Sequence, residues 1–377
     1  MKLTYSDEQL ALQETLGRFI TKDYSFKTRH EIIHSPDGIS AAHWAQFAEL
    51  GLLALPFAEE YGGLGGTAVD TMLVMEAIGC GLMVEPYLAT VVLAGGLLRT
   101  AGSNAQKVSL LPKIADGSLL MGFAHYEAGG RYEIDQVKTQ ATRVGGASRL
   151  NGVKTFVLHG AQANQLVVSA RDADKPNGLS LFLVDANAEG VSIRDYATQD
   201  NQRAAEITFT DVRLGADALL GNAGEALPVI ECVLDAANAA LCAEAVGAMD
   251  ALNQATLEYL KTRKQFGVPI GSFQALQHRM VDMFTAAEQA RSMVILASIR
   301  VQSGDVAERR WACAAAKVLV CESARLVGQQ AVQLHGGMGV TDELNISHYF
   351  KRLTVIAASF GDADHHLGYV SDRLLAA

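Results

Sequence analysis

The densest group of chemically capable side chains lies near the C-terminus, in the stretch ASFGDADHHL at residues 358–367. Asp362 precedes His365 and His366 by three and four residues, which is the spacing of two metal ligands on one helix face. No other concentration of His, Cys or Asp supplies the remaining ligands. We therefore expect no metal site. Asp362 and Asp364 instead suit the polar start of a helix, where the dipole favours aspartate.

A second candidate group lies in YLKTRKQFGVPIGSFQALQ, residues 259–277. The pattern predicts a helix that runs to Lys264, a break at Gly267–Pro269 and a new helix with Ser272 as its N-cap. A cationic side chain at one helix end, close to the start of another helix, can hold a phosphate-bearing ligand. The spacing alone favours an ordinary basic helix terminus, which the dipole also stabilises.

The third candidate is the glycine-rich QLHGGMG at residues 333–339. Paired glycines let a ligand approach the backbone closely. The segment does not have the G-x-G-x-x-G pattern after a strand that marks a dinucleotide-binding turn. A helix C-cap explains the same glycines equally well.

Three regions of different periodicity must position these residues. Residues 1–118 have apolar side chains at helical spacing, beginning with a capping box from Ser6 to Gln9. Residues 119–225 contain short β-rich runs separated by turn residues, which predict an antiparallel barrel or sandwich. Residues 226–377 contain long alanine-rich helical stretches typical of a four-helix-bundle-like domain. The fold class is therefore α+β, with a helical domain, a β-domain and a helical bundle.

Composition limits the possible partners and the compartment. The net charge of −10 disfavours binding to nucleic acid or to anionic membranes through a basic face. No apolar stretch is long enough to span a bilayer, and the N-terminus lacks the apolar region of a secretory signal. The five cysteines form no C-x-x-C pair, as expected for thiols in a reducing environment. We expect a cytoplasmic protein.

Taken together, the motifs resemble the acyl-CoA dehydrogenase family of flavoproteins. The strongest likeness is TRKQFGVPIGSFQALQ followed by QAVQLHGGMG. PFAEEYGGLGG, LNGVKTFVLHG and DVRLGADALLG resemble the family's N-terminal loop, β-domain hairpin and β-domain exit, so the likeness extends over nearly the whole chain. It implies removal of hydrogen from Cα and Cβ of an acyl-CoA thioester. A glutamate takes the α-proton, and the β-hydrogen leaves as hydride to N5 of FAD.

The family's residues for the outer half of FAD are present in this chain. They are Arg263, Phe266, Gln274, Gln333, Gly336 and Gly337. The resemblance implies that the arginine meets the FAD pyrophosphate across a subunit interface. The phenylalanine and the first glutamine would lie beside the adenine and its diphosphate. The second glutamine and the glycines would form a loop that the same FAD approaches, so a second subunit is implied.

The reacting end departs from the family. The family's E-G-T falls on Phe360–Asp362, so the catalytic glutamate is replaced by phenylalanine. The alternative base position on a bundle helix is Ala237, and the arginine that normally follows it is Asn238. The family's T-E-P becomes Tyr126–Ala128, and its W-I-T, which covers the flavin and bonds N5, becomes Phe156–Leu158. Loss of a general base typically lowers a rate by roughly 10²–10⁴-fold or more.

Three hypotheses follow. The leading one is a non-catalytic chain of an FAD-dependent acyl-CoA dehydrogenase, assembled with a second subunit as an α₂β₂ tetramer and contributing no catalytic residue. The second is a catalytic homo-oligomer in which Asp362 or Asp364 replaces the base, because an apolar pocket can tune a carboxylate. The third is a non-enzymatic binding protein on the same fold. The acyl group is left open between fatty, dicarboxylic and steroid side chains.

Overall fold

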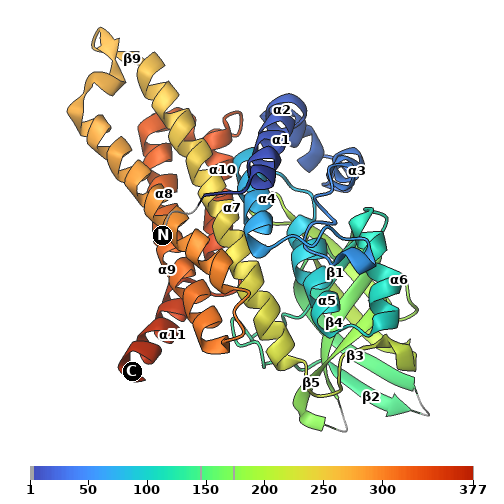
Figure 1. The fold of residues 1–377 in the computed structure, drawn as a ribbon. Coiled ribbons are helices and arrows are strands. Elements are labelled where there is room, and N and C mark those ends of the chain that lie inside the picture. Colours follow the sequence, from blue (N-terminus) through green and yellow to red (C-terminus); the bar gives the residue numbers. More distant parts are fainter. Residues whose placement is uncertain (1–3, 145–146, 173–174, 377) are drawn as a thin grey trace. The chain divides into compact units, whose positions relative to one another are not determined.

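A computed structural model describes residues 4–144, 147–172 and 175–376 of the chain. Helices come first along the sequence, strands follow, and helices return, as Figure 1 shows. This order confirms the α+β class predicted from the change of periodicity.

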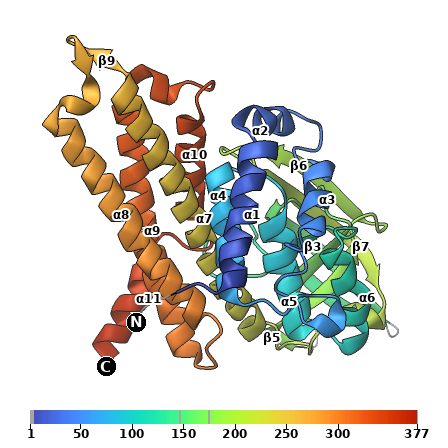
Figure 2. The same ribbon diagram turned by 45° about the horizontal axis from the view of Figure 1, so that its top comes forward.

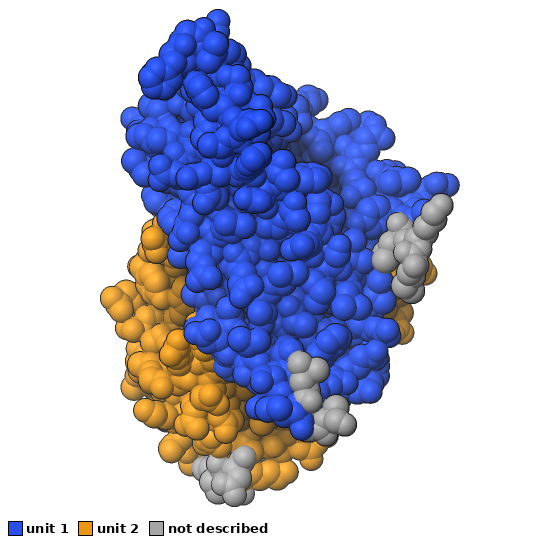
Figure 3. Space-filling model, turned by 90° about the vertical axis from the view of Figure 1, so that its left-hand side faces the viewer, with its two compact units in different colours: residues 1–31, 68–83, 238–377 blue, residues 32–67, 84–237 orange. Residues whose placement is uncertain are grey.

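The chain forms two compact units, which are coloured separately in Figure 3. The first contains residues 1–31, 68–83 and 238–377, and the second contains residues 32–67 and 84–237. This division differs from the domains 1–118, 119–225 and 226–377 expected from the sequence, and those boundaries stay a prediction.

The second unit is built around a sheet with the strand order β6-β7-β3-β2-β4-β5-β8, and β1 pairs with β4. The strands are β1 (Met121–Ala124), β2 (Gln140–Val144), β3 (Ala147–Leu158), β4 (Gln165–Asp172), β5 (Lys175–Asp185), β6 (Val191–Ala197), β7 (Arg203–Leu214) and β8 (Leu219–Leu220). The predicted antiparallel arrangement is right for most pairs. It is wrong for β1–β4 and β2–β4, which are parallel because connecting segments separate these strands in sequence.

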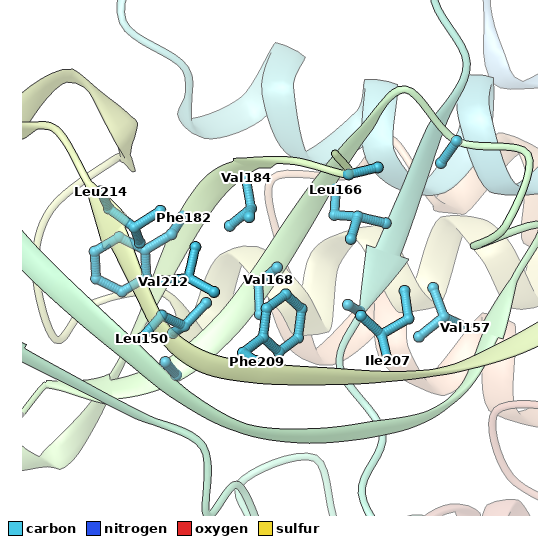
Figure 4. Packing of buried hydrophobic residues seen from close by; sticks show 14 of the residues in the cluster. Leu150, Val157, Leu166, Val168, Phe182, Val184, Ile207, Phe209, Val212 and Leu214 are labelled. Carbon is cyan, nitrogen blue, oxygen red and sulfur yellow. The ribbon is translucent and has the colours of Figure 1, made fainter. Parts of the chain in front are cut away.

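Apolar side chains from several strands of this sheet pack together as a buried cluster. Figure 4 shows Leu150, Val168, Phe182, Ile207 and Phe209 meeting from four strands. The helices of the unit are α3 (Ala41–Glu49), α5 (Gly95–Ala101) and α6 (Asn104–Ala115), with a π-helical segment at Leu88–Ala94. Burial of such side chains contributes about 25 cal/mol per Å² of apolar area, so this core fixes the register of the strands.

The first unit is helical, and Figures 1 and 2 show long helices packed side by side. Helices wholly or partly in this unit are α1 (Asp7–Asp23), α2 (Phe26–Ile33), α4 (Ala68–Gly81), α7 (Leu227–Thr262), α8 (Gln274–Arg300), α9 (Val306–His335), α10 (Asn345–Ala358) and α11 (Ala363–Ala376). Ser6 and Gln9 form the predicted capping box of α1. Within the described ranges, no helix is long and apolar enough to cross a bilayer.

Helices α4 and α7 cross with their backbones almost in contact. A Cβ added to Gly79 would lie 1.9 Å from the carbonyl oxygen of Glu244, and one added to Gly247 would lie 1.9 Å from that of Glu76. Only glycine fits at either position. The close approach buries Glu76 between the helices.

Three carboxylates surround one guanidinium beside this crossing. Arg291 of α8 contacts Glu76 at 3.4 Å, Glu288 at 3.3 Å, and Asp250 at a shorter distance. Burial raises the pKa of Glu76 to about 7, and the charges of Asp250 and Glu288 act in the same direction against the opposing effect of Arg291. The cluster therefore retains a proton near neutrality.

This proton makes the unfolding free energy depend on pH. The pKa of Glu76 is raised on folding from the ordinary 4.5 to about 7, so stability should fall as pH rises through that interval. Glu76→Gln should remove up to about 3 kcal/mol of this pH-dependent decrease, since one pKa unit corresponds to about 1.36 kcal/mol. Denaturant unfolding at pH 5 and pH 8 measures the free energy of unfolding. Glu288→Gln, which changes a more exposed carboxylate of the same cluster, is the control. Equal pH dependence in wild type and Glu76→Gln would contradict the assignment.

Candidate functional site

The segment that carries Arg263 forms a projecting hairpin at the end of α7 (Figure 1). Strands β9 (Lys264–Gln265) and β10 (Val268–Pro269) pair antiparallel, and the amide of Ile270 donates to the carbonyl of Arg263 at 2.8 Å. Phe266 sits at the turn with φ 54° and is 92% exposed. An aromatic ring held so far into solvent is available to a ligand or to another chain.

Two predictions about this segment were wrong. Helix α7 ends at Thr262, before Lys264, because the chain turns into the hairpin there. Ser272 does not cap α8, which begins at Gln274. Its hydroxyl donates instead to the carbonyl of Pro269 within a short 3-10 turn. Arg263 and Gln274 consequently lie at the two ends of the hairpin, and both are exposed.

The glycine-rich loop begins where α9 ends at His335. Gly336 has φ 60°, and its amide donates to the carbonyl of Gln333. A Cβ added at Gly336 or Gly337 would meet nothing within 4 Å. The backbone here is open, as a closely approaching ligand requires. The glycines also terminate α9, so the loop fits both predictions from the sequence, a backbone open to a ligand and a helix C-cap.

The hairpin and the glycine loop lie at the same end of the helical unit. The ring of Tyr259 stacks on His335 with centroids 4.4 Å apart, and its hydroxyl donates to the carbonyl of His335 at 3.4 Å. Arg279 also reaches Gln330 at 3.3 Å. These contacts place the glycine loop beside the last turn of α7, from which the hairpin follows. The residues expected to face FAD lie on the hairpin (Arg263 and Phe266), at the start of α8 (Gln274) and at the end of α9 (Gln333, Gly336 and Gly337).

This arrangement fits the outer half of FAD. An exposed guanidinium can pair with a diphosphate, an exposed ring can pack on adenine, and the open glycine backbone admits a large ligand. All four side chains of the set are exposed. Their exposure suits a cofactor shared with a second chain.

Phe360, the position at which the resemblance places a catalytic glutamate, lies in a tight corner between α10 and α11. Phe360 and Gly361 both have positive φ, 52° and 109°. Lys317 of α9 donates from Nζ to the carbonyls of Ile356 at 2.9 Å and Ser359 at 2.5 Å, and to Oδ1 of Asn238 at 3.4 Å. Three acceptors require three N–H groups, so this buried side chain is an ammonium even though burial lowers the pKa of Lys317.

The carbonyl of Phe360 is held from two sides. Asn238 donates to it from Nδ2 at 3.4 Å, and His366 donates from Nε2 at 3.1 Å. Burial lowers the pKa of His366 to about 3, with Lys317 and His365 adding to the effect, so His366 is a neutral donor. The backbone of the corner is fixed by side chains from α7, α9 and α11.

The Asp/His cluster is the start of α11. Oδ1 of Asp362 accepts from the amide of His365 at 3.0 Å, which confirms the predicted polar helix start. Asp364 and His365 are exposed. Among the residues that the structure describes, no three or more His, Cys, Asp or Glu side chains are grouped to hold a metal ion.

Two segments of the β-domain, Tyr126–Ala128 and Phe156–Leu158, also depart from the family's motifs. Glu127 accepts from Nζ of the fully buried Lys154 at 2.8 Å, from Oγ1 of Thr139 at 2.6 Å, and from the amides of Lys138 and Thr139. All of these hydrogen bonds to the Glu127 carboxylate hold the loop in place.

Phe156 has φ 52° within an irregularity of β3. Leu158, two residues later, is half-buried and has no hydroxyl to offer flavin N5.

Four residues that shape these sites were not predicted from the sequence. Lys154 and Lys317 each stand alone in an apolar run, GVKTFVL and CAAAKVLV, and a lone lysine in such a run indicates a buried cation. Tyr259 and His335 lie inside the motifs, but nothing in their spacing shows that the two rings meet.

Comparison with known proteins identifies the family. Models of the acyl-CoA dehydrogenase N-terminal, middle and C-terminal domains match residues 6–118, 122–212 and 227–375. The chain is 32% identical to the acyl-CoA dehydrogenase FadE12 of Mycobacterium tuberculosis, over 91% of this chain and 89% of that protein. It is 29% identical to the probable acyl-CoA dehydrogenase YngJ of Bacillus subtilis over the full length of both.

A solved structure, the ChsE4-ChsE5 complex from Mycobacterium tuberculosis, contains a chain similar to this one. The TM-score is 0.90 at 25% identity, with all of both chains covered. These matches, which cover the N-terminal, middle and C-terminal domains, show that the chain belongs to the acyl-CoA dehydrogenase family of FAD-dependent oxidoreductases.

Proposed function

We propose that this chain is the non-catalytic subunit of a heteromeric acyl-CoA dehydrogenase, an α₂β₂ tetramer in the cytoplasm. It lends Arg263, Phe266, Gln274, Gln333, Gly336 and Gly337 to an FAD whose flavin ring and general base belong to the partner chain. The acyl-CoA substrate is dehydrogenated in the partner's site.

The corner at Phe360 is the observation that carries this proposal. A phenylalanine stands where the base is expected, and the alternative position is the buried Ala237. Lys317, Asn238 and His366 hold the corner through backbone carbonyls. A general base needs a titratable group within hydrogen-bond reach of the substrate proton, and neither position provides one.

The alternative of Asp362 as a substitute base is disfavoured by its hydrogen bonding. Its carboxylate caps α11 through the amide of His365, and rotating it toward a substrate would leave the helix start without its cap. The catalytic homo-oligomer is therefore the weaker candidate.

Resemblance to heteromeric proteins supports the proposal. The ChsE4-ChsE5 structure is described as a complex of two differently named chains. The stretches AHYE, TRKQFGVPIGSFQ and FGDADHH resemble the small subunit of pimeloyl-CoA dehydrogenase. The acyl group stays open between fatty, dicarboxylic and steroid side chains.

The cofactor role of Arg263 gives a direct test. In the assembly isolated through a tag on this chain, Arg263→Ala should weaken FAD binding by about 10- to 100-fold, because a charge-assisted hydrogen bond is worth about 1.5–3 kcal/mol. Titration of the flavin-stripped assembly with FAD measures the dissociation constant. Lys264→Ala, the adjacent exposed cation, is the matched control. An unchanged affinity in Arg263→Ala would refute the role.

A second variant separates the subunit hypothesis from the substitute base. Asp362→Asn keeps a side chain that caps a helix as well as aspartate does but cannot accept a proton as a base. Flavin reduction by acyl-CoA in the isolated assembly should keep its wild-type rate within about twofold, because the base belongs to the partner. A loss of 100-fold or more, with an unchanged melting temperature, would establish Asp362 as the base.

A further inference from the structure

Two of the segments expected to contact FAD, the Arg263 hairpin and the glycine loop, follow different helices that are far apart in sequence. Arg263 follows the end of α7, whereas Gly336 follows the end of α9. A ligand that touches both needs a fixed distance between them, because a displacement of even about 1 Å is costly for a charge-assisted contact. Some contact between α7 and α9 must set that distance.

Tyr259 and His335 make this contact at the last turn of each helix. The amide of Arg263 donates to the carbonyl of Tyr259 at 2.8 Å, so a single backbone turn connects the arginine to the ring. His335 directly precedes Gly336. Stacking of the two rings, with centroids 4.4 Å apart and 28° between their planes, therefore connects the two segments by a direct side-chain contact.

Both rings are fixed in orientation. Nδ1 of His335 donates to the carbonyl of Ala331 at 2.8 Å, and the imidazole is neutral because burial lowers the pKa of His335. The hydroxyl of Tyr259 donates to the carbonyl of His335. Gly339 packs closely against the end of α9, where an added Cβ would lie 2.5 Å from the carbonyl oxygen of Val332 and 3.1 Å from Cβ of His335.

We infer that Tyr259 and His335 are positioning residues for cofactor binding, which set the distance between the Arg263 hairpin and the glycine loop for FAD. This inference rests on the proposed function of the six-residue set. The pair acts through Arg263, Gly336 and Gly337.

The test measures FAD affinity and stability together in the tagged, flavin-stripped assembly. Tyr259→Leu and His335→Leu each remove the stack and should raise the FAD dissociation constant by about 3- to 10-fold, the equivalent of one aromatic pair. Tyr259→Phe keeps the stack and loses only the long hydroxyl contact, so its dissociation constant should stay within about twofold of wild type.

Thr256→Val is the matched control, one turn earlier on α7. It removes a buried hydroxyl that donates to the carbonyl of Leu252 at 2.7 Å, and so changes a buried side chain of α7 without removing the stack. Its FAD dissociation constant should not change. Equal weakening by Thr256→Val and Tyr259→Leu would assign the effect to general destabilisation and overturn the inference.

Failure of the inference and failure of the proposed function give different results. If Arg263→Ala weakens binding but both leucine variants leave it unchanged, the positioning role is wrong and the cofactor role stands. If Arg263→Ala also leaves binding unchanged, the proposed function itself fails. If Tyr259→Leu does not fold, His335→Leu provides the test, because it removes the other, smaller ring of the same stack from α9. Tyr259→Phe keeps the stack and shows the effect of the hydroxyl contact alone.

Discussion

The corner between α10 and α11 depends on one buried ammonium. Lys317 is fully buried and donates to the carbonyls of Ile356 and Ser359 at the end of α10, where helix carbonyls lack partners within the helix. An unpaired charge in the interior is tolerated only when all its donors are used. The same cation, with Asn238 and His366, fixes Phe360 in the left-handed region, and the chain then enters α11 at once.

On the proposal of a non-catalytic chain, that constraint explains how the fold can persist without the family's base. The corner is held through backbone carbonyls, so the side chain at position 360 is free to change while the turn persists. A similar separation applies in the β-domain, where Glu127 and Lys154 keep the loop in place although Leu158 has no hydroxyl. At both places the contacts that hold the backbone involve other atoms than those that the reaction would use.

Much of the fold could be predicted from sequence because it rests on local patterns. The capping box at Ser6, the β-rich middle region and the helix start at Asp362 each depend on neighbouring residues. Ser272 was misplaced as a cap because its hydroxyl bonds backward to Pro269, a competition that the sequence does not reveal. The roles of Lys317 and of the Tyr259–His335 stack depend on residues brought together from distant helices, so no local pattern encodes them.

The visible spectrum of the purified chain shows most directly whether this chain holds a complete flavin site of its own. It is recorded for the chain alone and for the assembly isolated with its partner, before and after anaerobic addition of a mixture of acyl-CoA thioesters. We expect the chain alone to carry no flavin, or a flavin that stays oxidised, and the assembly to carry a flavin that bleaches. About one flavin per chain that bleaches in the absence of any partner would contradict the account, because this chain would then hold a complete site and its own base.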